Sequence, residues 1–169
     1  DGALDSIEAS GVSNTAIGSV AGTAITTGDY NVTIGHESLK SNTTASCNTA
    51  IGSLSLRDNT TGSDNTAVGE SSLRENETGC CNAVLGENAM TLNTSGCYNT
   101  SIGSFSLHNN TTANNNVAAG LCSLYTNTTG ACNTALGSFT LFDNTTGLRN
   151  VAIGHSALGN NTTAGNSQA

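Results

Sequence analysis

The sequence predicts an all-β protein, a parallel β-solenoid (β-roll) of about nine 17-residue coils. An Asn opens every repeat at an unchanged spacing that no insertion interrupts, namely Asn14, Asn31, Asn48, Asn65, Asn82, Asn99, Asn116, Asn133 and Asn150. A Gly follows each of these Asn residues four positions later. A unit of this length is too short for the helix pair of α-helical repeats, which takes about 33–34 residues, and fixed Gly and Asn disfavour helices. Short strands joined by turns remain.

The repeat divides into four short segments. If each recurring Asn is place one, the consensus reads N-T-A-I-G-S-x-S-L-x-x-N-T-T-G-x-x. We predict short strands at N-T-A-I and at S-x-S-L, with corners at the Gly of place five and at N-T-T-G. Stacked coils then place every residue over its counterpart 17 positions away, at about 4.8 Å. Residues 14–166 form nine repeats, 1–13 a partial N-terminal coil, and 167–169 the start of a further coil.

Apolar residues at places four and nine are predicted to fill the interior. Place four runs from Ile17 to Ile153, and place nine holds Leu or Met except for Gly22. Neighbouring residues of a strand point to opposite faces, so the Ala-rich place three is expected outside, as a stripe for lateral packing. We therefore expect Ile102→Asp to unfold or split the array. The Asn residues of place one are expected to pass amide hydrogen bonds along the stack.

The low content of charge excludes two classes of partner. The chain has 169 residues, a formal net charge of -8 and four Lys and Arg residues, too few to neutralise a run of phosphates. Docking on an anionic membrane is excluded on the same ground, and no apolar run approaches the roughly 20 residues that span a bilayer. We expect no nucleic-acid partner and no membrane insertion.

The six Cys residues favour disulfides and an oxidising compartment. Cys80 and Cys97 share place sixteen in adjacent coils, so a Cα separation of about 4.8 Å suits a disulfide. The pair Cys81 and Cys97 is a close competitor. Cys47, Cys81 and Cys132 share place seventeen two or three coils apart, which is too far to bridge within one rod, and Cys122 is expected to fill the core.

No catalytic constellation is apparent, and we expect no enzymatic activity, cofactor or metal. His36 and His155 share place six but lie seven coils apart, and His108 stands alone at place ten. The acidic residues near Arg57 and Arg74 are typical of a solvated mixed-charge face rather than of a carboxylate pair for hydrolysis.

Many N-glycosylation sequons recur at places twelve to fourteen. The candidate sites, including two at place one, are Asn42, Asn59, Asn76, Asn93, Asn110, Asn127, Asn144, Asn161, Asn31 and Asn99. The same letters are also ordinary turn chemistry, because Asn tolerates left-handed φ and Thr hydroxyls cap backbone groups. Both interpretations stay open, and a turn on the outside of a rod is where a glycan fits.

Residues 48–62 (N-T-A-I-G-S-L-S-L-R-D-N-T-T-G) and 133–147 (N-T-A-L-G-S-F-T-L-F-D-N-T-T-G) resemble a repeat of phage-type tail-fibre and related surface-fibre proteins. The core N-T-A-I-G is also similar to the head repeats of trimeric autotransporter adhesins. The resemblance implies an elongated, often trimeric fibre for attachment, located extracellularly or on a cell or virion surface. Its partners are then copies of itself, side by side or end to end, and glycans that are attached or bound.

The two ends of the chain suggest how rods join. Three residues at one end and thirteen at the other make nearly one coil, so head-to-tail stacking is expected to build a composite coil. The residues assigned to this contact are Asp1, Ala3, Leu4, Ser167, Gln168 and Ala169. Alternatively, the chain is a fragment of a longer chain with more repeats, which would leave the same incomplete coils at its two ends.

Ice binding is the competing function. N-V-T-I-G (31–35) and N-V-A-I-G (150–154) resemble the N-x-V-x-G repeat of some plant ice-binding solenoids. Against it, the Thr column of place two is interrupted by Val32, Ala83, Val117 and Val151.

Overall fold

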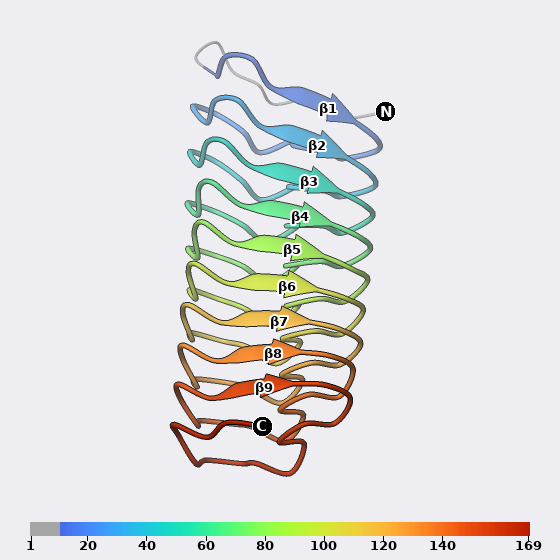
Figure 1. Cartoon of the computed structure of the whole chain (residues 1–169). Coiled ribbons are helices and arrows are strands. Elements are labelled where there is room, and N and C mark those ends of the chain that lie inside the picture. Colours follow the sequence, from blue (N-terminus) through green and yellow to red (C-terminus); the bar gives the residue numbers. More distant parts are fainter. Residues whose placement is uncertain (1–10) are drawn as a thin grey trace.

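The computed structural model describes residues 11–169 as a β-solenoid with one short strand per coil. Figure 1 shows the nine strands one below another along a rod, with the turns of each coil beside and behind them. The strands are β1 Thr15–Ile17, β2 Val32–Ile34, β3 Thr49–Ile51, β4 Thr66–Val68, β5 Ala83–Leu85, β6 Thr100–Ile102, β7 Val117–Ala119, β8 Thr134–Leu136 and β9 Val151–Ile153. Across these residues no helix is long and apolar enough to cross a membrane.

The strands pair in parallel, each with the next along the chain. Thr15 pairs with Val32 and Ile17 with Ile34, and the same offset of one repeat continues to β8 and β9. Gln168 extends the pattern by bridging to Val151. The predicted fold class and the place-over-place stacking are confirmed.

The prediction of a second strand at S-x-S-L is wrong, because the described residues form turns there. Left-handed φ values recur at places seven and nine, as at Leu54 (60°) and Leu56 (49°), and again at place seventeen, as at Cys47 (60°). A residue with positive φ cannot continue an extended strand, so the chain turns here. Its backbone groups still bond along the stack, since the Leu56 amide donates to the Ser72 carbonyl at 3.0 Å.

The Gly of place five is required by both backbone angle and space. Gly52 has a φ of +134°, outside the regions that L residues adopt. A Cβ atom there would lie 2.4 Å from the Gly69 carbonyl oxygen of the next coil. The corner after each strand therefore accepts only glycine.

The interior is built from places three, eight and nine, which corrects one prediction. At place three Ala50, Ala67 and Ala118 are fully buried, whereas at place four Ile51 and Ile102 are 36% and 45% exposed. The expected burial of place four is wrong, and the Ala stripe lies inside instead of outside. The unfolding expected of Ile102→Asp is withdrawn with it, because the Ile102 side chain is half-exposed. Because the interior also holds the small residues of place eight and the Leu of place nine, place three has room only for small side chains, Ala in most coils and at the largest Thr33 or Val84.

Place nine follows the prediction, with an exchange in the first repeat. Leu39, Leu56 and Leu107 are fully buried. Gly22 replaces this Leu in the first coil, and Ile25 replaces the Asn of place twelve. Ile25 is fully buried, and its Cδ1 lies 3.2 Å from where a Gly22 Cβ would be. One aliphatic side chain per coil thus fills the space from either place.

Two columns of buried Asn side chains run along the rod. At place one the Asn48 Oδ1 accepts from the Asn65 amide at 3.0 Å, while the Asn48 Nδ2 donates to the Gly62 carbonyl at 3.0 Å. At place twelve the side chains bond to one another, for example Asn76 Nδ2 to Asn59 Oδ1 at 2.7 Å. The amide ladder expected at place one forms there only in part, from Asn31 to Asn14, Asn82 to Asn65 and Asn99 to Asn82, whereas at place twelve it continues from coil to coil.

Candidate functional surfaces

The outer face of the sheet is an uncharged and largely apolar surface, which we call the strand face. It consists of places two and four of every repeat, because place three points inward. Place two carries Thr, Val or Ala and place four carries Ile, Val, Leu or Ala, without a charged residue at either place. The aliphatic side chains of place four that are most exposed are Ile17, Ile51, Leu85, Ile102, Leu136 and Ile153, at 36–61%.

Parallel pairing keeps these side chains in straight columns. Ile17 lies over Ile34 and Leu136 over Ile153, at the spacing of about 4.8 Å between strands. An apolar surface of this kind along a whole rod exceeds the scattered single residues that soluble proteins expose. The strand face is thus the principal candidate interaction surface.

The sequon asparagines do not point outward as expected. Nine of the ten candidates are buried, namely Asn31, Asn42, Asn59, Asn76, Asn93, Asn99, Asn110, Asn127 and Asn144. Their side-chain nitrogens are already bonded, as in Asn93, which donates to Asn76 Oδ1 at 2.7 Å and to the Gly96 carbonyl at 3.1 Å. A glycan on such a nitrogen requires the coil to open, so turn chemistry accounts for these residues.

Three sequon asparagines keep some contact with solvent. Asn161 is half-buried and donates to the Ala164 carbonyl at 3.0 Å. Two further sequons begin at Asn109 and Asn160. Asn109 is half-buried, and Asn160 is exposed. Both occupy place eleven, directly before the buried column. Glycosylation remains a prediction for these three.

The structure brings Cys80 and Cys97 together as thiols. The two Sγ atoms are 2.9 Å apart, and the Cys80 amide donates to Cys97 Sγ at 3.0 Å. Other coils place a Ser oxygen in that role, since the Asp29 amide donates to Ser46 Oγ. The hydrogen bond to Cys97, assisted by burial, raises the pKa of the Cys80 thiol to about 12. The disulfide itself remains a prediction.

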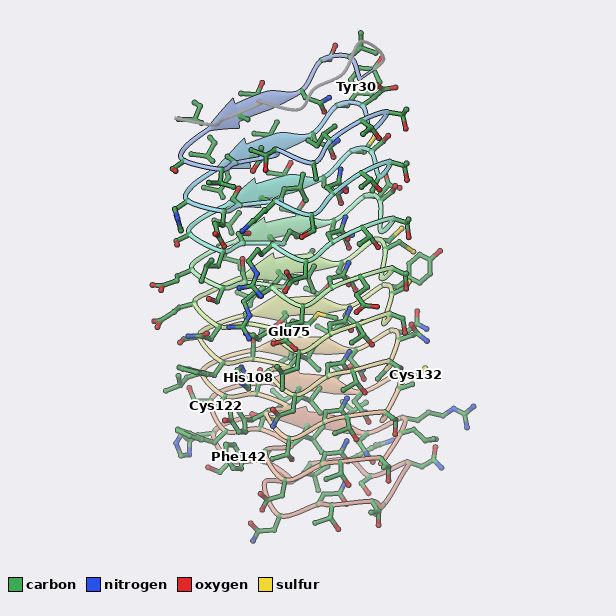
Figure 2. The ribbon with its side chains drawn as sticks, turned by 180° about the vertical axis from the view of Figure 1, so that it is seen from behind. Tyr30, Glu75, His108, Cys122, Cys132 and Phe142 are labelled. Atoms are coloured by element: carbon green, nitrogen blue, oxygen red, sulfur yellow. The ribbon has the colours of Figure 1, made fainter. Side chains whose placement is uncertain are left out.

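The other four Cys residues are also free thiols. Cys47 and Cys132 are exposed at place seventeen, and Cys81 is half-buried. Cys122, expected in the core, is only partly buried, although burial raises its pKa. Figure 2 labels Cys122 and Cys132 on different sides of the rod, so they do not approach each other.

The predicted end-to-end contact is only partly described. Asp1, Ala3 and Leu4 lie outside the described residues. At the other end, the Ser167 amide donates to Asn150 Oδ1 at 2.9 Å, and the Ile153 amide donates to the Ala169 carbonyl at 2.8 Å. Residues 167–169, Gln168 among them, thus lie against β9 as each strand lies against the one before it.

Within residues 11–169 no three His, Cys, Asp or Glu side chains gather in reach of one metal ion. Three pairs of charged side chains instead form local ion pairs among the described residues. Lys40 pairs with Glu37 at 2.8 Å, and this contact lowers the pKa of the Glu37 carboxyl. Arg57 binds Asp58 with Nε to Oδ1 at 2.9 Å and Nη2 to Oδ2 at 2.7 Å.

A column of stacked rings, not anticipated from the sequence, runs along places seven and ten of the later coils. His108 stacks on Tyr125 and Tyr125 on Phe142, with centroids 5.3 and 5.2 Å apart and planes within 5°. Phe105 and Phe139 pack against it at an angle. Figure 2 labels Glu75, His108 and Phe142 along the middle of the rod as seen from behind. The signal was available in the sequence as rings at places seven and ten of successive repeats.

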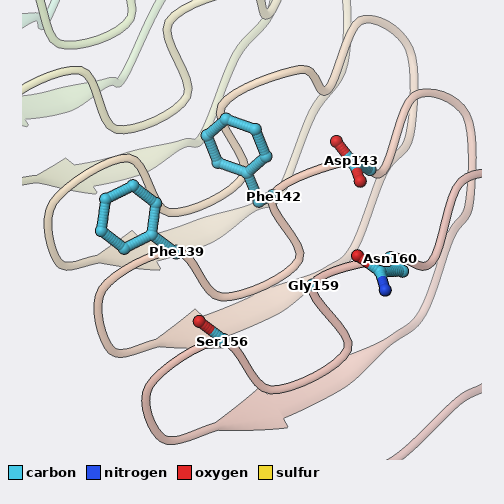
Figure 3. A pocket seen from close by; sticks show the side chains of 6 residues that line it. All are labelled: Phe139, Phe142, Asp143, Ser156, Gly159 and Asn160. Atoms are coloured by element: carbon cyan, nitrogen blue, oxygen red, sulfur yellow. The ribbon is translucent and has the colours of Figure 1, made fainter.

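The column ends at an open hollow of about 330 Å³. Figure 3 shows Phe139 and Phe142 on one coil, with Ser156 and Gly159 on the next. Asp143 and Asn160 complete the wall. The hollow exists because two large side chains at places seven and ten are followed, one coil later, by Ser and Gly.

Comparisons with known proteins leave the chain without an assigned family. No family model matches it, nor does any curated protein or solved structure.

Proposed function

We propose that the protein is a structural rod of an extracellular fibre, in which copies of the solenoid associate side by side through their strand faces. The observation that carries this proposal is the exposed aliphatic column of place four. Since apolar burial contributes roughly 25 cal/mol per Å², a column of Ile, Leu and Val along a rod is a large driving force for association.

The charge distribution favours a second copy as the occupant. The net charge of -8 makes two rods repel over most of their surfaces. The strand face carries no charged residue, so two or three rods can approach there with the least repulsion. Identical columns with identical spacing also allow the side chains of one rod to lie between those of the next.

The test is sedimentation of two variants with equal charge. Ile102→Glu places a carboxylate in the middle of the strand face, whereas Ser104→Glu places it two residues away, at place six, where Glu70 and Glu87 occur naturally. The parent and Ser104→Glu are expected to form the same small oligomer, and Ile102→Glu is expected to remain monomeric. Circular dichroism should be unchanged in all three. A parent protein that is strictly monomeric at high concentration overturns the proposal.

Ice binding is the second candidate, because the strand face presents two regular columns along the rod. Thr at place two is interspersed with Val, and both columns repeat at the strand spacing. Thermal hysteresis of the parent separates the candidates. A monomer with hysteresis that Ile102→Glu abolishes supports ice binding, whereas an oligomer without hysteresis supports the fibre.

A further inference from the structure

The ring column has one vacant position, at place ten of the ninth repeat. Tyr125 stacks on one face of Phe142. The residue that would stack on the other face is Gly159, which has no side chain, and the hollow occupies that space. The rings of the column are spaced by one coil, so a planar group of similar thickness fits against Phe142 at Gly159.

Beside this vacancy lies a carboxylate that lacks its usual partner. In two earlier coils the acid of place eleven pairs with the Arg of place ten, as in Arg57 with Asp58 and Arg74 with Glu75. Asp143 follows Phe142 instead of an Arg. Among residues 11–169 its carboxylate has neither an ion pair nor a hydrogen bond, and it lines the hollow.

We propose that the hollow binds a guanidinium group, stacked on Phe142 and held by the carboxylate of Asp143. A guanidinium is planar, stacks on aromatic faces and donates two parallel hydrogen bonds to a carboxylate. The Arg57–Asp58 pair shows this bidentate contact within the same rod. Asn160 supplies a further amide oxygen at the wall.

The residues that line the hollow disfavour an anionic ligand. No Lys or Arg lines it, and the chain carries a net charge of -8, so an anion is repelled. A neutral planar ligand gains the stacking but leaves the Asp143 carboxylate without a cation. The site lies at places seven, ten and eleven, apart from the strand face of places two and four, and the proposal does not depend on lateral association.

The test is an NMR titration of the full chain, produced without glycans, with N-acetyl-arginine amide. Its neutral isostere, N-acetyl-citrulline amide, serves as the ligand control. We expect saturable shifts of the Phe142 and Tyr125 ring signals with the arginine compound, and binding weaker by about tenfold or more with the citrulline compound. A pentapeptide, Gly-Gly-Arg-Gly-Gly, distinguishes the source: tighter binding than the amide indicates an arginine within a peptide, and equal binding indicates a small guanidinium compound.

Three variants complete the experiment. Asp143→Asn is expected to weaken binding by about tenfold, since it removes the charge and keeps the shape. Gly159→Arg fills the vacant place with the residue type of Arg57 and Arg74, and should abolish binding while the fold is retained. Asp64→Asn, an exposed acid at place seventeen, should leave binding unchanged. Equal affinity for arginine and citrulline, no saturable shift, or undiminished binding by Gly159→Arg would overturn the proposal.

Discussion

Each coil uses Asn for two different tasks. The Asn of place one bonds to backbone groups of two coils, whereas the Asn of place twelve donates to the equivalent side chain of the preceding coil. Both side chains are buried, so each bond replaces one with water, and each group would be costly if left unpaired. The amide has both donor and acceptor atoms, and only such a group can continue a column indefinitely.

The place-twelve column predicts a large difference between two Asn→Asp changes. Asn93→Asp removes both donated hydrogen bonds and directs a carboxylate at Asn76 Oδ1 and the Gly96 carbonyl. We expect it to lower the free energy of unfolding by about 3–5 kcal/mol at neutral pH. Asn114→Asp, exposed at place sixteen, should change it by less than about 0.5 kcal/mol.

Chemical denaturation measures both changes, and pH provides a check. Burial raises the pKa of a carboxyl, so the destabilisation by Asn93→Asp should shrink as pH falls toward about 4, where the unfolded carboxyl also binds a proton. A loss of stability that is independent of pH would show that the charge is not its cause.

The left-handed residues predict stabilising changes. Cys132 has a φ of 60° and an exposed side chain, so its conformational cost is not offset by packing. Asn115 and Asn166 occupy the same place, and Asn tolerates this conformation better than most residues. Cys132→Asn should raise the free energy of unfolding by roughly 0.5–1 kcal/mol, and the β-branched Cys132→Val should lower it. The midpoints of unfolding in guanidinium chloride measure both changes. A higher midpoint for Cys132→Val than for Cys132→Asn would contradict the role of the left-handed φ.

At the scale of the element, a strand of only three residues gives each coil one inward and two outward positions. Places two and four share the outer face, and place three alone enters the interior. The strands are stabilised by their parallel neighbours on both sides, because a single three-residue strand has no independent stability.

Adjacent alanines in β7 test this orientation directly. Ala118 is fully buried between Ser101 and Ala135, so Ala118→Leu overpacks the interior and should cost at least about 1–3 kcal/mol. Ala119 lies on the strand face between Ile102 and Leu136, where Ala119→Leu should change stability by less than about 0.5 kcal/mol and strengthen association. Thermal unfolding of the two variants compares them. A larger loss of stability in Ala119→Leu than in Ala118→Leu would indicate that place four, rather than place three, faces the interior.

Two adjacent coils are positioned for a covalent link. With Cys80 Sγ and Cys97 Sγ 2.9 Å apart, oxidation by glutathione disulfide should remove one hydrogen from each thiol and join the coils, with reduction of the glutathione. The one-repeat loop closed in this way should add about 3 kcal/mol to the free energy of unfolding. Peptide mapping should find the Cys80–Cys97 link, and Cys97→Ser should prevent it. A dominant Cys81–Cys97 link would contradict the prediction.

For the whole molecule, charge and apolar surface oppose each other. In the proposed side-by-side association, the net charge of -8 opposes contact between rods, and burial of the strand face favours it. The balance depends on salt, because screening weakens the repulsion and has little effect on apolar burial.

This balance predicts that lateral association strengthens with ionic strength. Between about 0.02 and 0.3 M salt the Debye length falls from roughly 20 Å to about 6 Å, and the association constant should rise severalfold. Guanidinium binding at Phe142 and Asp143 should weaken over the same range, since it joins opposite charges. Sedimentation equilibrium measures the first effect. Association that weakens with salt would indicate that ion pairs, rather than the strand face, join the rods.

The sequence by itself determined the coil length, the register and the corner after each strand. A repeat of constant length without interruption allows only place-over-place stacking, and the Gly of place five marks a backbone conformation closed to other residues. Burial of place nine followed from its Leu residues. The sequence also shows Gly22 and Ile25 at unusual places in the first repeat, but it does not show that Ile25 fills the space of the missing Leu.

Only the tertiary structure decided which side of the strand enters the interior. The repeat period alone does not tell whether Ala118 or Ala119 faces the interior. The greater hydrophobicity of place four favoured that place as the buried one. The choice depends on the width of the coil, because Leu107, Asn93 and their equivalents already fill it and leave space only for a small side chain, Ala in most repeats. The hollow beside Phe142 also required the stack, since it arises from the difference in size between side chains that are one repeat apart in sequence and adjacent in space.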